Sequence, residues 1–410
     1  MSDNVGWGPY GSPYGGVPGG PAAPGWGGWG PPPSPKPGVI PLRPLTVGDI
    51  LSGAFATVGG YKKVVIGIPA AVFGAYTLVM VGALLIAFSA VSDTFYELID
   101  LPDGQDPDWD RIQPLVVAFG SIGLVAMIGY LLAIALVQAS MLAVLQDAVL
   151  GRPAGFGSVW RQAMPRVPAV IGTTLLSGLI AMVPVALATA GFATAMIGAS
   201  LLASGEYGDA EAGALVGFGV LGALVTAVPA VWLWVKFSLA PAAVVFEKQG
   251  PIQAMRRSSE LVRGRWWPVF GISLLVYVIA GVIAYVIQQA ITMIGFIPAI
   301  AGAASLGSEP ELSELLSAFA LYIVAALVAQ LIGYVIQTTF PPLATGLLYV
   351  DQRIRKENLA PVLAEAAGMP APPGPPGGPV PPAPPGGPIP DDAGGPVPPA
   401  PGGPVPPVSP

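Results

Sequence analysis

Six long runs without a charged residue fill the middle of the chain. They cover residues 64–92, 112–146, 167–205, 212–235, 266–308 and 315–350. Each is longer than the roughly 20 residues that an α-helix needs to cross a hydrocarbon core about 30 Å thick. Only 10% of the residues are charged, against roughly a quarter in soluble proteins. We therefore predict an all-α, polytopic membrane protein with six transmembrane helices.

The charges between these runs alternate in sign along the chain. The segments after the first, third and fifth runs are acidic, and they cover 93–110, 206–211 and 309–314. The segments before the first run and after the second, fourth and sixth are rich in Lys and Arg. Each run therefore joins a basic flank to an acidic one, which requires an odd number of crossings. The run 266–308 is too short for three crossings, which need about 60 residues.

The positive-inside rule places basic flanks in the cytoplasm. We expect a multi-pass protein of the cytoplasmic membrane with both termini inside the cell.

The six runs are also predicted to form three copies of one unit. Apolar residues before the first run follow the spacing of an amphipathic helix: Val47, Ile50, Leu51, Ala54, Phe55 and Val58. Similar stretches precede the third and fifth runs, and Gly67, Gly172 and Gly271 occupy matching places. We predict a membrane domain over 45–360 with repeats 45–150, 151–248 and 249–357, each an interfacial helix followed by a hairpin. The alternative is that hairpin proteins share such basic entry segments without being repeats.

The two ends of the chain have a different composition. Residues 1–41 consist largely of Gly and Pro with a few aromatic residues, and 369–410 repeat Gly-Gly-Pro-(Val/Ile)-Pro. Such segments cannot bury a core, and we predict that both are disordered. Proline-rich segments bind aromatic grooves of partner proteins, but they also serve as spacers. The composition does not choose between these roles.

The sequence contains no Cys and no His. Thiol nucleophiles, thiolate and imidazole metal ligands and the commonest general base are therefore excluded. Gly217, Gly219 and Gly222 match a dinucleotide-binding spacing, but they lie in an apolar helix without the preceding strand that this motif requires. We interpret them, with Gly213, as a helix-packing face. We expect no enzyme activity, no cofactor, no metal and no nucleic-acid partner.

Polar side chains inside the runs provide the candidates for solute binding. Gln330, Tyr334 and Gln337 share one face of the sixth predicted helix, which would suit a transporter or channel for a small or lipid-like solute. The alternative is that such amides bond one another across helix interfaces. Lys236 is expected to extend its ammonium to the interface, with an ion path as the alternative.

A basic segment before the fifth run provides candidate lipid-headgroup contacts. They are Lys248, Arg256, Arg257, Arg263 and Arg265, followed by Trp266 and Trp267. Clustered cations attract anionic headgroups. The alternative is that they serve only to fix the topology. We expect membrane lipid as a partner, and the sequence does not give the oligomeric state.

Three stretches carry a family resemblance: 40–55, 240–272 and 347–357, including E-x-x-G-x-x-x-A-x-R-x-S from Glu247 and Arg-Gly-x-Trp-Trp from Arg263. They resemble actinobacterial membrane proteins grouped with the membrane domain of glycerophosphodiester phosphodiesterases. The resemblance implies a membrane module without the catalytic half, because that chemistry uses paired histidines. The leading hypothesis is a non-enzymatic scaffold or accessory module that contacts lipid or protein partners, with a transporter as its rival.

Overall fold

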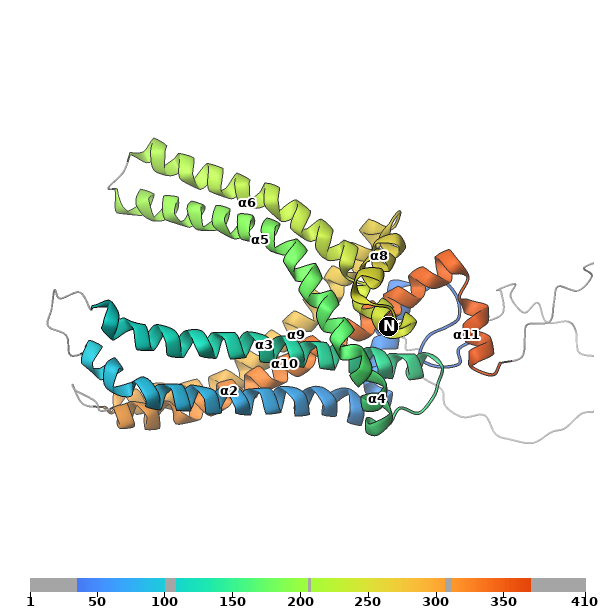
Figure 1. The fold of residues 1–410 in the computed structure, drawn as a ribbon, viewed down its shortest axis with the longest axis horizontal. Helices are drawn as coiled ribbons and strands as arrows, with labels where there is room; N and C mark the ends of the chain where they lie inside the picture. The colour runs from blue at the N-terminus through green and yellow to red at the C-terminus, as the bar shows by residue number, and fades with distance from the viewer. Residues whose placement is uncertain (1–34, 100–107, 206–207, 307–311, 370–410) are drawn as a thin grey trace, which may run out of the picture. The chain divides into compact units, whose positions relative to one another are not determined.

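A computed structural model describes residues 35–99, 108–205, 208–306 and 312–369 (Figure 1). Over these residues the chain is helical and has no strand. The elements are α1 (Val47–Gly60), α2 (Lys62–Ile99), α3 (Trp109–Val149), α4 (Phe156–Ala163), the 3₁₀ turn η1 (Met164–Arg166), α5 (Val167–Ser204), α6 (Asp209–Phe237), α7 (Ala240–Glu247), α8 (Pro251–Val262), α9 (Trp266–Ala304), α10 (Leu312–Glu357) and α11 (Ala360–Ala366). The described part contains six helices long and apolar enough to cross a membrane, which confirms the predicted fold class.

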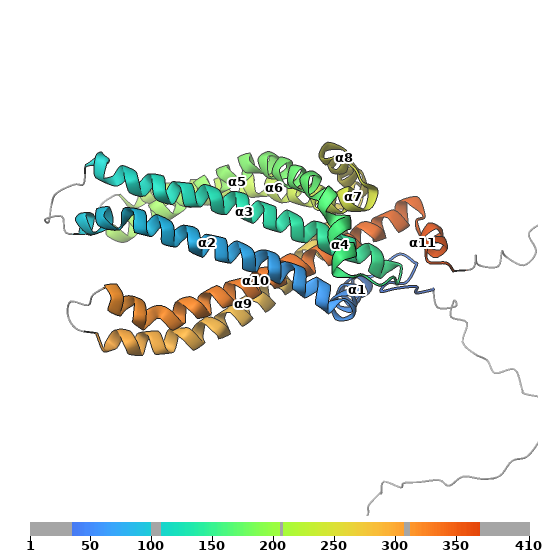
Figure 2. The same ribbon diagram turned by 60° about the horizontal axis from the view of Figure 1, so that its bottom comes forward.

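The six long helices form three antiparallel hairpins. α2 packs along α3, α5 along α6, and α9 along α10. All three hairpins turn at the same end, which we call the turn end, and Figures 1 and 2 show this from two sides. We call the opposite end the base. Away from the base, α5 and α6 diverge from the other hairpins in Figure 1.

A short helix at the base precedes each hairpin, as the sequence predicted: α1 before α2, α4 before α5 and α8 before α9. The buried face of α1 differs from the predicted one, because Val47 and Phe55 are 41% and 52% exposed. Gly53 is buried on this face instead, and a Cβ there would lie 2.9 Å from side-chain atoms of Ile40 and Leu347. The segment that leads into α1 lies against this position through Val39 and Ile40.

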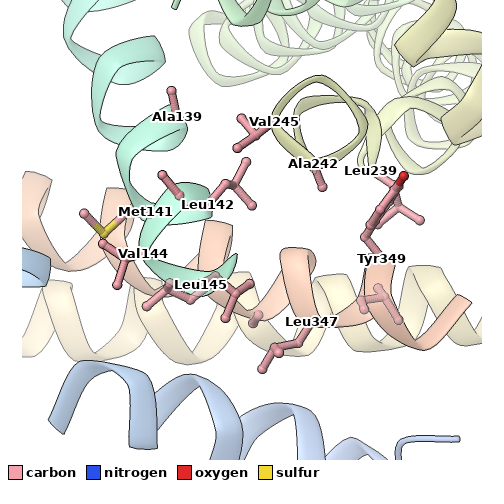
Figure 3. Close-up of a cluster of buried hydrophobic side chains, with 14 of the residues drawn as sticks. Ala139, Met141, Leu142, Val144, Leu145, Leu239, Ala242, Val245, Leu347 and Tyr349 are labelled. Atoms are coloured by element: carbon pink, nitrogen blue, oxygen red, sulfur yellow. The ribbon is translucent and has the colours of Figure 1, made fainter. Parts of the chain in front are cut away.

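The continuous core lies at the base, where the three hairpins meet. Figure 3 shows buried side chains from the end of α3, from α7 and its start, and from α10 gathered there. Leu142, Leu145, Leu239 and Leu347 are each at most 1% exposed. Full burial of such a side chain contributes about 1.5–3 kcal/mol, so this end is expected to hold the hairpins together.

Further toward the turn end, large apolar side chains face outward on every hairpin. Leu78 of α2 is 75% exposed, Phe218 of α6 is 74% exposed and Ile294 of α9 is 67% exposed. Contiguous apolar surface on this scale is rare on soluble proteins. We expect lipid acyl chains to cover this surface.

The helices exceed what the hydrocarbon core requires. α10 has 46 residues, which correspond to about 69 Å at 1.5 Å per residue, about twice the thickness of the core. The Lys- and Arg-containing end of α10 therefore has room to extend beyond the membrane together with the packed base.

Glycines set the close approach of α5 and α6. A Cβ on Gly219 would lie 2.5 Å from the backbone nitrogen of Ala195, and Cβ atoms on Gly191 and Gly198 would meet α6 backbone atoms at 2.7 Å and 2.8 Å. The predicted packing face was wrong in three of its four members, because a Cβ added to Gly213, Gly217 or Gly222 would meet no atom of another helix within 4 Å. Gly219 alone of that set faces α5.

Candidate functional site

Glu247, the last residue of α7, is the centre of a polar network at the base. Its carboxylate accepts hydrogen bonds from Nε of Arg257 at 3.0 and 3.1 Å and from the hydroxyl of Tyr349. Arg257 also pairs with Glu357, which accepts at 2.9 Å from Nε of Arg353. The network joins α7, α8 and α10 across about a hundred residues of sequence.

The hydrogen bonds and charges of this network shift the pKa of Arg257. Burial alone would lower the pKa of Arg257, but its hydrogen bonds to Glu247 and Glu357 outweigh that effect and raise it. Arg257 was a predicted lipid contact. The structure leaves its side chain partly exposed and pairs it with two carboxylates, those of Glu247 and Glu357.

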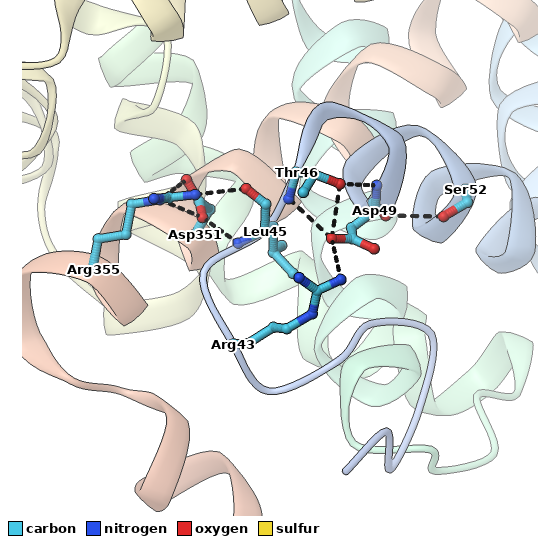
Figure 4. Close-up of polar contacts among 7 residues, drawn as sticks. All are labelled: Arg43, Leu45, Thr46, Asp49, Ser52, Asp351 and Arg355. Carbon is cyan, nitrogen blue, oxygen red and sulfur yellow. Dashed lines mark hydrogen bonds and ion pairs between the residues drawn. The ribbon is translucent and has the colours of Figure 1, made fainter. Parts of the chain in front are cut away.

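Asp351 is the centre of a second network, which fastens the segment before α1 to α10 (Figure 4). The backbone N–H of Leu45 donates to Asp351 Oδ1 at 2.7 Å, and Nε of Arg355 donates to both carboxylate oxygens at 2.8 and 2.9 Å. Arg355 then donates to the carbonyl of Leu45 at 2.6 Å. Asp351 is only 2% exposed. Its carboxylate therefore relies on these protein donors for hydrogen bonds, because water has little access to it.

A capping box next to this network fixes the start of α1. Asp49 accepts a hydrogen bond from the backbone N–H of Thr46 at 2.9 Å, and the Thr46 hydroxyl accepts from the N–H of Asp49 at 3.1 Å. Figure 4 shows Arg43 reaching the same carboxylate, at 3.3 Å. The hydrogen bond from Thr46 and the nearby charge of Arg43 lower the pKa of Asp49.

The other predicted headgroup contacts lie on the outside of the base. Lys248, Arg256 and Arg263 are exposed, and Arg265 is half-buried. None of the four forms an ion pair with a described residue. Aromatic side chains at the base are also exposed, including Trp267 at 74% and Phe156 at 52%. Unpaired cations and aromatic rings therefore share this end.

The structure does not bring Gln330, Tyr334 and Gln337 together around one of the cavities found. Tyr334 stacks on Phe73, with ring centroids 4.8 Å apart, inside a cluster completed by Tyr76 and Tyr130. Gln330 and Gln337 are exposed, and neither side chain bonds a described residue. A solute path through this face stays a prediction.

A cavity of 330 Å³ with a mainly apolar lining and a few polar groups lies elsewhere, between α3, α5, α6 and α9. Its polar lining includes Gln138, Thr174, Ser177, Trp234 and Tyr277. Thr174 and Ser177 are three residues apart on α5, and Trp234 and Ser238 are four apart at the end of α6, which are local signals for shared polar faces. The other groups come from separate hairpins, so the sequence could not assemble them.

Two more predicted features can be placed. Lys236 lies in the last turn of α6, with its Nζ 4.5 Å from the ring centroid of Trp232. Protein contacts were expected through the tails 1–41 and 369–410, most of which (1–34 and 370–410) lies outside the described residues.

Comparisons with known proteins give one match. No curated protein and no solved structure matches the chain. The resemblance to phosphodiesterase membrane domains thus stays a prediction. A family described as a domain of unknown function, DUF7847, matches residues 64–347, from the start of α2 into the last third of α10. This match spans all three hairpins, and the chain therefore belongs to the DUF7847 family.

Proposed function

We propose that the chain is a non-enzymatic scaffold or accessory module of the cytoplasmic membrane whose base, on the cytoplasmic side, gathers anionic lipid. The observation that carries the proposal is the division of the cations at the base into two sets. Arg257, Arg353 and Arg355 are paired with carboxylates. Lys248, Arg256 and Arg263 are exposed and unpaired within the described chain.

The unpaired set has the strength to select lipids. A cation near an anionic membrane surface contributes about 1 kcal/mol, so three such cations contribute on the order of 3 kcal/mol before screening. Salt weakens the attraction, because the Debye length falls to about 8 Å at physiological ionic strength. The expected behaviour is a preference among lipids that depends on salt.

An apolar groove beside α4 offers a place for an acyl chain. It has a volume of 420 Å³ and lies between α2 and α3, with Phe156 and Trp160 of α4 at one end. The two rings are stacked, with centroids 5.9 Å apart. A helix that presents stacked aromatic rings to such a groove is typical of the membrane interface.

We expect purified protein, reconstituted in mixed bilayers, to hold spin-labelled phosphatidylglycerol more strongly than spin-labelled phosphatidylcholine. The preference should fall as salt is added. The variant Lys248→Gln/Arg256→Gln should weaken it, because two unpaired cations are lost.

The control for this experiment is Arg111→Gln, which removes an exposed cation next to the turn end of α3 and should leave the preference unchanged. Equal retention of the two lipids by the wild type at low salt would contradict the proposed function.

A further inference from the structure

We propose that a pocket between α6, α8 and α9 binds the phosphate of a single anionic phospholipid. The inference rests on the proposed function and names the site at which it acts. The pocket has a volume of 450 Å³ and we call it the Lys236 pocket. Its lining includes Trp232, Lys236, Ser259, Arg263, Gly264 and Trp266.

The charge of the lining is positive only. Lys236 and Arg263 contribute an ammonium and a guanidinium, and no lining residue carries a carboxylate. Neither cation forms an ion pair with a described residue. Two cations that share a pocket without a counter-ion repel each other, and a bound phosphate would remove that repulsion.

The pocket also offers hydrogen-bond donors without partners. The indole Nε1 of Trp266 is buried and has no hydrogen-bond partner among the described residues. A buried donor left unpaired costs about 1–3 kcal/mol, and a small rotation of the Trp266 ring toward the pocket would let a phosphate oxygen accept from it.

The start of α9 adds a positive electrostatic potential that attracts anions. Trp266 is the first residue of α9, and the first backbone bond of the helix runs from Val269 to Arg265 at 3.1 Å. The N–H groups before this bond stand at the positive end of a 39-residue helix, where anions are stabilised.

Local structure holds the pocket open. Gly264 has φ of +81°, a conformation that other residues rarely adopt, and it lets α8 turn sharply into α9. Lys356 donates to the carbonyls of Glu260 and Arg263 at 2.7 Å each, which fixes the end of α8. Ser258 donates to the carbonyl of Lys236 at 2.8 Å and ties α8 to the end of α6. The site is thus formed before a ligand arrives.

The surroundings favour a lipid over a soluble phosphate. Lys236 ends a membrane-spanning helix, and Trp232 and Val228 continue its face toward the turn end, 47% and 69% exposed. Trp267 on α9 is 74% exposed. A phospholipid can place its phosphate in the pocket and its acyl chains along these residues, whereas a soluble phosphate would leave them uncovered.

The test compares two double variants that lose the same charge. Lys236→Gln/Arg263→Gln alters the pocket, and Lys62→Gln/Lys63→Gln alters two exposed cations at the start of α2, outside the pocket. Native mass spectrometry of detergent-solubilised protein titrated with phosphatidylglycerol should show about tenfold weaker binding of the first lipid for the pocket variant. The matched variant should bind the first lipid like the wild type. Trp266→Phe keeps the ring and removes the N–H, and it should also weaken binding.

Each outcome has a defined meaning. If the wild type prefers phosphatidylglycerol over phosphatidylcholine but all three variants bind it equally, the pocket is wrong and the proposed function stands. If the wild type shows no preference, both fail. If the pocket double variant does not fold, Trp266→Phe decides the matter alone. Displacement of the lipid by an equal concentration of inorganic phosphate would reassign the pocket to a soluble ligand and overturn the proposal.

Discussion

Replacing Asp351 by alanine is expected to lower the free energy of unfolding by about 3–5 kcal/mol, the cost of breaking a buried ion pair from one side. The substitution leaves the guanidinium of Arg355 without its carboxylate and the N–H of Leu45 without its acceptor. It also frees the segment that covers α1. Denaturant titration of the helical circular dichroism signal in detergent micelles measures the change.

The matched control is Glu260→Ala. Glu260 is an exposed carboxylate at the same end, and only its backbone carbonyl accepts a hydrogen bond, from Lys356. Its removal should change stability by less than about 0.5 kcal/mol. Equal effects of the two substitutions would show that the Asp351 network does not hold the base together.

The second large effect is expected at Gly219. Gly219→Leu should destabilise the α5/α6 hairpin by about 3 kcal/mol or more, at the upper end of overpacking costs. The new Cβ would lie 2.5 Å from a backbone nitrogen of α5, and backbone cannot move aside as a flexible side chain can. Thermal unfolding of the purified protein in one detergent measures it.

Gly217→Leu, two residues away, is the control for that substitution. Its Cβ would meet no atom within 4 Å, so the added side chain should contact only lipid or detergent. A loss of stability for Gly217→Leu as large as that for Gly219→Leu would contradict the observed α5/α6 interface.

The long helices could be predicted from the sequence because charged residues flank each uncharged run, and charged residues are rarely buried in the hydrocarbon core. The first uncharged run, 64–92, lies within α2, and the helix extends beyond it at both ends since Lys62 and Glu97 can be solvated outside the hydrocarbon core. The helices before the hairpins were predicted from the 3.6-residue period alone. Both signals are local in sequence.

The features that the sequence did not reveal depend on partners far along the chain. Gly217 and Gly219 lie two residues apart in the same apolar stretch, and the sequence gives no reason to prefer one as a packing residue. Only the orientation of α6 against α5 shows that Gly219 faces the neighbouring helix. Arg257 and Arg256 are adjacent cations, yet of these two only Arg257 pairs with Glu357. Trp266 was expected at the membrane boundary, but its unpaired N–H becomes visible only when α6 and α8 are placed beside it. Periodicity carries no information about such pairings.

We propose that the three hairpins cross the membrane in the same orientation, with the turn end outside and the base in the cytoplasm. Because the chain contains no cysteine, single cysteines can be introduced without removing native ones. Cysteines at Asp108, Asp209 and Glu314 should react with a membrane-impermeant maleimide in intact cells, and cysteines at Gly157 and Glu260 only after permeabilisation. A protected cysteine at any turn end, or a labelled one at the base of intact cells, would contradict the arrangement.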